Sequence, residues 1–80
     1  MDAIRNRLAT CFQTVFPDLP EAEIPAATQA AVAAWDSVAA ITLVNVIEDE
    51  FGIQVDFDLL GELDSFGRIH EYLRGAMQAS

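Results

Sequence analysis

One serine and the carboxylates around it are the residues best suited to chemistry in this chain of 80 residues. Ser37 directly follows Asp36 and opens an apolar stretch that ends in consecutive acids, Glu48, Asp49 and Glu50. A serine in this position can cap a helix, act as a nucleophile or carry a covalent group. Capping is the commonest of these roles, so the Asp-Ser dipeptide alone does not establish a function.

The position of Ser37 at the start of a predicted helix favours an anionic group on its hydroxyl. Free main-chain N–H groups and the helix dipole both face a helix N-terminus and stabilise negative charge there. Ala40, three positions further on, cannot complete a capping box, so Ser37 would be a cap without its usual partner. A phosphodiester built on Ser37 would be well placed.

The elements that must position Ser37 are helices. Apolar residues recur at helical spacing in stretches that predict helices over Asp2–Phe16, Ser37–Glu50 and Phe66–Met77. Gly52 should close the second of these in a left-handed conformation, and Asp64-Ser65 should cap the third.

The connections between these helices are unequal in length. Prolines describe a long first loop from Pro17 to Trp35, within which Ala26–Ala34 has the composition for a helical turn or two. A short helix is expected between Val55 and Leu63. We therefore predict an all-α fold, a small four-helix bundle of three main helices and one short helix with a long first loop, in which residues 1–80 form a single domain.

The second helix should have two faces with different uses. One face carries a core stripe of Ala40, Leu43, Val44, Ile47 and Phe51. The opposite face carries Val38 and Ile41, which are apolar although the core does not need them. Asp36, Glu48 and Asp49 surround this pair, which predicts a small apolar contact with an acidic rim.

The composition limits the partners and the location. Thirteen acidic residues against four basic ones give a net charge of -9, which repels phosphate backbones and anionic lipid headgroups. We expect no nucleic-acid binding and no membrane insertion, and we expect a cytoplasmic monomer. Cys11 is the sole cysteine, so it cannot form an internal disulfide, and its place in the first apolar stripe predicts a small buried hydrophobe.

Two longer motifs carry a family resemblance. The stretch DSVAAITLVNVIEDEFGI, followed later by LDSFGRIHEYL, resembles the acyl carrier protein family, in which Asp-Ser-Leu opens the second helix and the last helix ends in an apolar-Tyr-apolar signature. The likeness covers nearly the whole chain. In that family the serine carries covalent 4'-phosphopantetheine through a phosphodiester, and the thiol of that arm holds an acyl group as a thioester. The resemblance implies that Ser37 is the attachment residue and that Asp36 helps the phosphopantetheinyl transferase and its magnesium to engage.

The same resemblance assigns the outer face of the second helix. Val38 and Ile41 correspond to hydrophobic contacts with partner enzymes, and Glu48 and Asp49 to contacts with the basic docking surfaces of acyl-loading and acyl-processing enzymes. The implied protein is a carrier for fatty-acid, polyketide or related synthesis and not an enzyme, since the carbon chemistry belongs to the cofactor and the partners.

The chain departs from the family pattern in ways that bear on partner choice. Val38 replaces the usual leucine, and Thr42 stands where many fatty-acid carriers have glutamate. A peptidyl or aminoacyl carrier is the nearest alternative, but those domains tend to have Gly-His before the serine and less acid. Here Trp35-Asp36 precedes the serine and the pI is near 4.1, which favours an acyl carrier.

Three alternatives lie outside the family. Asp56, Asp58 and Gly61 match part of an EF-hand loop, but Leu60 and Gly67 stand where an oxygen ligand and the closing glutamate belong, so no metal site is predicted. An independent enzyme would need His70 as a base, yet no third catalytic group or oxyanion motif accompanies it. An unmodified acidic helical interaction module would use Ser37 only as a cap.

The remaining large apolar residues are expected to pack. Trp35 should hold the long loop against the bundle. The residues Phe57, Leu59, Leu60 and Leu63 should cover the end of the core, in the region where the resemblance places a shelter for acyl chains.

Overall fold

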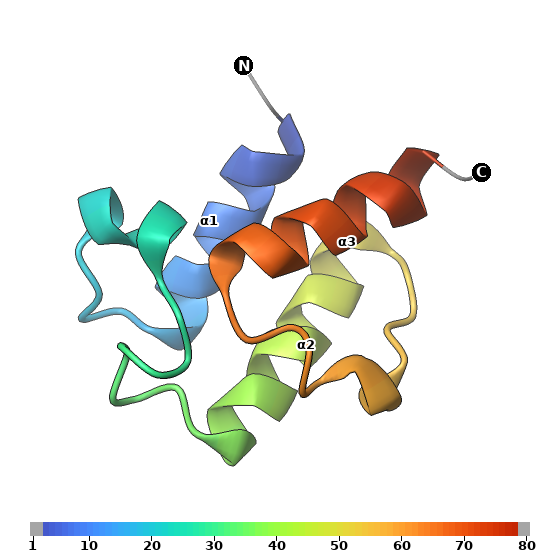
Figure 1. Ribbon diagram of the computed structural model, residues 1–80. Coiled ribbons are helices and arrows are strands. Elements are labelled where there is room, and N and C mark those ends of the chain that lie inside the picture. Colours follow the sequence, from blue (N-terminus) through green and yellow to red (C-terminus); the bar gives the residue numbers. More distant parts are fainter. Residues whose placement is uncertain (1–2, 79–80) are drawn as a thin grey trace.

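The computed structural model describes residues 3–78, which form three α-helices whose connecting loops carry two short 3-10 helices. Figure 1 shows how these elements are arranged. In chain order the elements are α1 (Ala3–Val15), η1 (Glu21–Ala26), α2 (Ser37–Phe51), η2 (Phe57–Leu59) and α3 (Phe66–Gln78). Within the described residues, pairing of strand type is limited to an isolated bridge between Thr28 and Ser65. The all-α prediction is confirmed, and η2 is the predicted short helix.

The ends of the main helices lie close to their predicted limits. The predicted start of the first helix at Asp2 falls outside the described residues, and α1 ends at Val15, one residue before the predicted Phe16. α2 continues one residue beyond Glu50. Gly52 then adopts a left-handed conformation with φ 65° and ψ 35°, and its N–H donates to the Glu48 carbonyl at 2.8 Å. Gly52 therefore closes α2 as predicted, because glycine enters this region without a Cβ penalty.

The first connection is helical in a different place from the prediction. Helical turns were expected over Ala26–Ala34, but η1 lies before that stretch, at Glu21–Ala26. Ile24 of η1 is fully buried, and the burial of this large side chain favours a helical turn at that position. The alanine stretch keeps only isolated turns, in which the Val32 N–H donates to the Thr28 carbonyl at 2.9 Å and the Trp35 N–H donates to the Val32 carbonyl at 2.9 Å.

Main-chain hydrogen bonds to the start of α3 explain why the alanine stretch is not a continuous helix. The Phe66 N–H donates to the Ala27 carbonyl at 2.9 Å, and the Gln29 N–H donates to the Asp64 carbonyl at 2.8 Å. These groups are thereby removed from any local helical ladder, so the intrinsic propensity of alanine is overridden by tertiary contacts. We refer to this pair of bonds as the loop staple.

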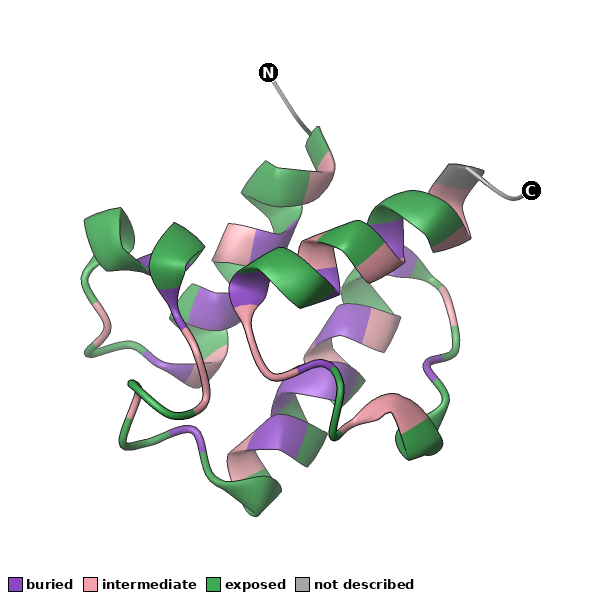
Figure 2. Ribbon diagram, in the orientation of Figure 1, coloured by how far each residue is buried: buried purple, intermediate pink, exposed green. Residues whose placement is uncertain are grey.

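The core lies between the three helices and the first loop, and Figure 2 shows the buried residues on the facing sides of the helices. The fully buried side chains include Leu8, Cys11, Phe12, Ile24, Leu43, Ile47 and Leu73. The Phe12 ring meets the Trp35 ring edge-on at 5.3 Å, and it meets the Phe66 ring at the same distance. Trp35 is 2% exposed, which confirms that it packs the long loop against the bundle.

Cys11 belongs to this core. Burial raises the pKa of its thiol to about 11, and the negative charge of Glu50 acts in the same direction. The thiol therefore stays protonated at neutral pH and packs as a small apolar group, as predicted.

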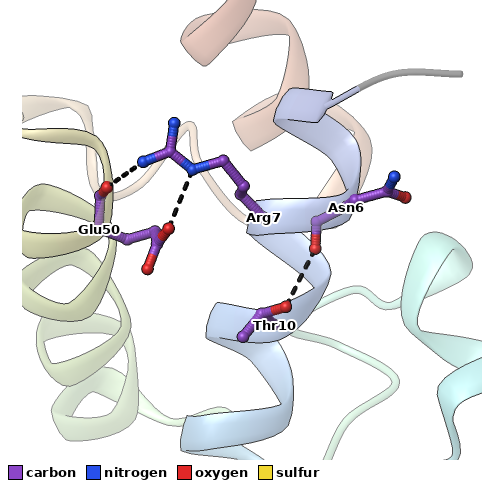
Figure 3. Close-up of polar contacts among 4 residues, drawn as sticks. All are labelled: Asn6, Arg7, Thr10 and Glu50. Atoms are coloured by element: carbon purple, nitrogen blue, oxygen red, sulfur yellow. Dashed lines mark hydrogen bonds and ion pairs between the residues drawn. The ribbon is translucent and has the colours of Figure 1, made fainter.

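An arginine on α1 holds the C-terminal end of α2 (Figure 3). Arg7 Nε lies 2.9 Å from Glu50 Oε2, and a second guanidinium nitrogen donates to the Glu50 carbonyl. The guanidinium also lies over the Phe51 ring, 4.6 Å from its centroid. An exposed ion pair alone contributes little, but a cation that also meets the last carbonyls of a helix and an aromatic face stabilises that helix end through several contacts.

Candidate functional site

The N-terminus of α2 is capped by Asp36. Its backbone is extended, with φ −99° and ψ −172°, and its Oδ1 accepts a hydrogen bond from the Ala39 N–H at 2.8 Å. The Ala40 N–H donates to the Asp36 carbonyl at 2.9 Å and so starts the helical ladder. The alternative in which Ser37 is the cap is therefore wrong, because the carboxylate one position earlier occupies that role.

Ser37 is the first helical residue and is exposed. Across residues 3–78, the structure gives its hydroxyl no hydrogen-bond partner within the chain. The first N–H groups of a helix have no intrahelical acceptor, so an anion attached to the Ser37 oxygen meets unpaired donors and the positive end of the dipole. The hydroxyl is thus accessible, and its surroundings fit a phosphodiester.

A second Asp-Ser dipeptide provides an internal comparison. Asp64-Ser65 precedes α3 as Asp36-Ser37 opens α2, but here the serine is the cap, since Ser65 Oγ accepts from the Arg68 N–H at 3.1 Å. The hydroxyl of Ser65 is therefore committed to the fold, as the sequence predicted for this segment. In the first dipeptide the aspartate is the cap, and in the second the serine is the cap. The hydroxyl of Ser37 is therefore free of a capping bond, whereas that of Ser65 is not.

A comparison with family models shows which family the chain belongs to. The model described as the phosphopantetheine attachment site matches residues 6–73, which include Ser37 and all three α-helices in large part. The chain belongs to the phosphopantetheine-binding carrier family. Searches of curated proteins and of solved structures gave no match.

Membership of the carrier family brings a cofactor and a general role. Carriers of this family hold 4'-phosphopantetheine covalently, are not catalytic themselves, and interact with a phosphopantetheinyl transferase and with biosynthetic enzymes. The accessible hydroxyl of Ser37 and the unpaired helix amides beside it suit such an arm.

The outer face of α2 in this carrier is apolar near Ser37. Val38 is 73% exposed and Ile41 is 44% exposed, whereas Ile47 on the opposite face is 2% exposed. The predicted core stripe of α2 is buried, as its five residues Ala40, Leu43, Val44, Ile47 and Phe51 show. The prediction that Val38 and Ile41 lie outside the core is confirmed.

The three consecutive acids at the other end of α2 have different roles in the structure. Glu48 is partly buried and its Oε2 accepts from the Val55 N–H at 2.7 Å, while Glu50 is paired with Arg7. Asp49 is exposed, and within the described residues its carboxylate has no such contact. Sequence reasoning could not separate these acids, because Arg7 lies 43 positions from Glu50 and the other partner is a main-chain group.

The acidic residues near the apolar pair are not equally close to it. Asp36 adjoins Val38, but Asp49 follows Ile41 by eight positions, which at the helical rise corresponds to ~12 Å along α2. The predicted rim is therefore an acidic residue at each end of the exposed face rather than a closed ring.

Two further candidate residues take part in local contacts. The His70 ring stacks on Phe66 with centroids 6.3 Å apart, and Asp56 caps η2 by accepting from the Asp58 N–H at 2.9 Å. Phe57, which was expected to cover the core, is 54% exposed, so that expectation is wrong for this residue, whereas Leu63 is buried as predicted. No helix in the part of the chain that the structure describes has the length and apolar character to cross a membrane.

Proposed function

We propose that Ser37 carries the 4'-phosphopantetheine arm, and that the chain presents acyl groups, held as thioesters on that arm, to enzymes of fatty-acid, polyketide or related synthesis. The observation that carries the proposal is the exposed Ser37 hydroxyl at the first position of α2, free of the capping role that Asp36 fulfils. In the loading step, the serine oxygen forms a bond to the pantetheine-side phosphorus of coenzyme A. The phosphoanhydride bond breaks, adenosine bisphosphate leaves, and the serine proton is released.

Asp36 has two roles in this proposal. Its Oδ1 fixes the start of α2, and its second carboxylate oxygen is left for the magnesium ion that accompanies the transferase. After loading, the arm carries the reactive thiol away from the helix, and the carbon chemistry takes place in the partner enzyme.

The outer face of α2 supports a docking role. Val38 and Ile41 would form the apolar centre of the contact, and Asp36, Glu48 and Asp49 would attract basic residues of acyl-loading and acyl-processing enzymes. The acidic composition, with a net charge of -9, favours acyl groups over the peptidyl or aminoacyl alternative, whose carriers are less acidic.

The test is intact-mass measurement after incubation with a phosphopantetheinyl transferase and coenzyme A. The parent chain should gain the mass of one phosphopantetheine, and Ser37→Ala should gain none while staying folded, because Asp36 supplies the cap. Ser65→Ala is the matched control, since it alters the other Asp-Ser dipeptide, and it should be modified like the parent. Modification of Ser37→Ala, or its loss in a folded Ser65→Ala, would refute the assignment.

A further inference from the structure

The alanine-rich part of the first loop borders a cavity of about 510 Å³. The cavity lies among the end of α1 with the loop after it (15–20), η1, and the turn at 31–34; we call it the loop cavity. Six of its lining residues are alanines, whose small side chains leave this space unfilled: Ala22, Ala26, Ala27, Ala31, Ala33 and Ala34. Its volume falls in the range of small-molecule sites, roughly 300 to 1,000 Å³.

The loop cavity is close to the attachment serine. Ala34 lines the cavity and precedes Ser37 by three positions, so their Cα atoms are at most ~11 Å apart. A phosphopantetheine arm has about as many bonds as four residues of extended main chain, which reach ~14 Å. The end of an arm on Ser37 is therefore long enough to reach the cavity wall at Ala34.

The lining of the cavity selects by charge. The side chains are mainly apolar, and the charged residues among them, Asp18 and Glu23, are both acidic and exposed. Among the described residues that line the cavity, none is basic. A neutral hydrocarbon chain suits these walls, whereas a chain that ends in a carboxylate would be repelled by the two acids and would lose its hydration.

Trp35 lies behind the same wall. Its ring is 5.7 Å from that of Phe16, which lines the cavity, and its Nε1 is buried without a hydrogen-bond partner in the described structure. Since the chain has one tryptophan, tryptophan fluorescence reports on the surroundings of Trp35, which include Phe16 of this wall and Phe12 of the core.

From these observations we propose that the loop cavity receives the hydrocarbon end of a neutral acyl chain carried on Ser37 and excludes acyl groups that end in a carboxylate. This location differs from the region of Phe57, Leu59, Leu60 and Leu63, where the family resemblance places the shelter; none of those residues lines the cavity. The inference rests on the proposed attachment at Ser37.

The experiment compares three forms of the full chain made with the transferase: one carrying the unloaded arm, one carrying an octanoyl arm and one carrying an octanedioyl arm. The two acyl groups differ only in the terminal carboxylate. Intact mass establishes loading at Ser37, and amide chemical shifts and Trp35 fluorescence establish where the chain lies. The octanoyl form should show shift changes at residues 15–20, 22–26 and 31–34 and a changed Trp35 emission, relative to the unloaded arm. The octanedioyl form should show neither.

A variant whose new side chain fills the cavity tests whether the acyl chain binds there. Ala33→Phe places a large side chain at the cavity wall, and Ala30→Phe makes the same change at an exposed neighbour that does not line the cavity. The octanoyl-dependent changes should be lost in Ala33→Phe and kept in Ala30→Phe.

The outcomes distinguish this inference from the proposed function. Absence of any mass gain would refute attachment at Ser37, and with it the inference that depends on that attachment. Normal loading with octanoyl-dependent shifts confined to residues 57–63 and α3, or kept in full by Ala33→Phe, would overturn the loop cavity as the site while attachment at Ser37 stands. Equal perturbation by octanoyl and octanedioyl would overturn the selection by charge.

Discussion

The carboxylate of Glu48 accepts a hydrogen bond from the main-chain N–H of Val55 at 2.7 Å, across the turn that follows Gly52. Val55 is buried, so its N–H would otherwise lack a partner away from water. Glu48 thus fastens the connection between α2 and η2, although its neighbour Asp49 is exposed and has no such role in the described structure.

Glu48→Ala should destabilise the fold, and Asp49→Ala should not. Removing the Glu48 acceptor leaves a buried N–H unsatisfied, which costs about 1 to 3 kcal/mol, whereas a surface change at Asp49 stays within about 0.5 kcal/mol. Urea unfolding of both variants measures the difference. Equal stabilities would mean that the Glu48 bond contributes nothing. If the expected difference is found, Asp49→Lys is the better variant for testing steering of basic partners, because it leaves the fold intact.

Substitutions of Asp36 should separate its capping role from its charge. Asn caps a helix as well as Asp, so Asp36→Asn should keep the stability, whereas Asp36→Ala should lose ~1 kcal/mol. If the carboxylate also serves the transferase, both variants should be loaded more slowly than the parent at saturating coenzyme A. If Asp36→Asn is loaded at the same rate as the parent, the Asp36 carboxylate has no role in the transferase reaction and acts only as the helix cap.

The same substitution at two isoleucines of α2 should distinguish its faces. Ile41→Ala should leave stability within about 0.5 kcal/mol but weaken binding to a partner enzyme by ~1 to 2 kcal/mol, because Ile41 is exposed and lies at the centre of the proposed docking face. Ile47→Ala should lose ~2 to 5 kcal/mol of stability, because Ile47 is buried. Thermal unfolding and a binding titration on each variant provide both quantities. If Ile41→Ala binds the partner as tightly as the parent does, the assignment of Ile41 to the docking face is wrong.

Added salt should raise the thermal midpoint. The net charge of -9 means that the carboxylates of this small protein repel one another. The Debye length shortens from ~30 Å at 0.01 M to ~10 Å at 0.1 M salt, so added salt screens this repulsion. Calorimetry across this range at neutral pH measures the effect. A flat midpoint would show that the pairs that salt weakens, such as Arg7 with Glu50, balance the general repulsion, and a falling midpoint would show that they outweigh it.

The parts of the fold that local sequence encodes were predicted well. Periodic apolar residues located all three α-helices, and Gly52 and Ser65 were recognised as helix ends because cap chemistry is local. The exposed position of Ile41 followed from the same helical period.

Features set by distant contacts were missed. η1 forms where Ile24 meets the core, and the alanine stretch is held by bonds to residues 64–66, neither of which is visible in local propensity. At the site, the choice between Asp36 and Ser37 as cap depended on a register shift of one residue. The separate roles of Glu48 and Asp49 depended on a main-chain partner at Val55.

The loop staple has a consequence for the order in which the molecule is assembled. The Ser37 end of α2 is capped by bonds from Ala39 and Ala40 to Asp36, three and four positions apart, whereas the loop that lines the loop cavity is held by bonds between 27–29 and 64–66, across about half of the chain. Contacts of long sequence separation carry a larger closure entropy and tend to form later in folding. A chain emerging from the ribosome would therefore expose a properly capped Ser37 before α3 exists to complete the cavity. We expect the arm to be attachable to a nascent chain that cannot yet shelter what the arm will carry.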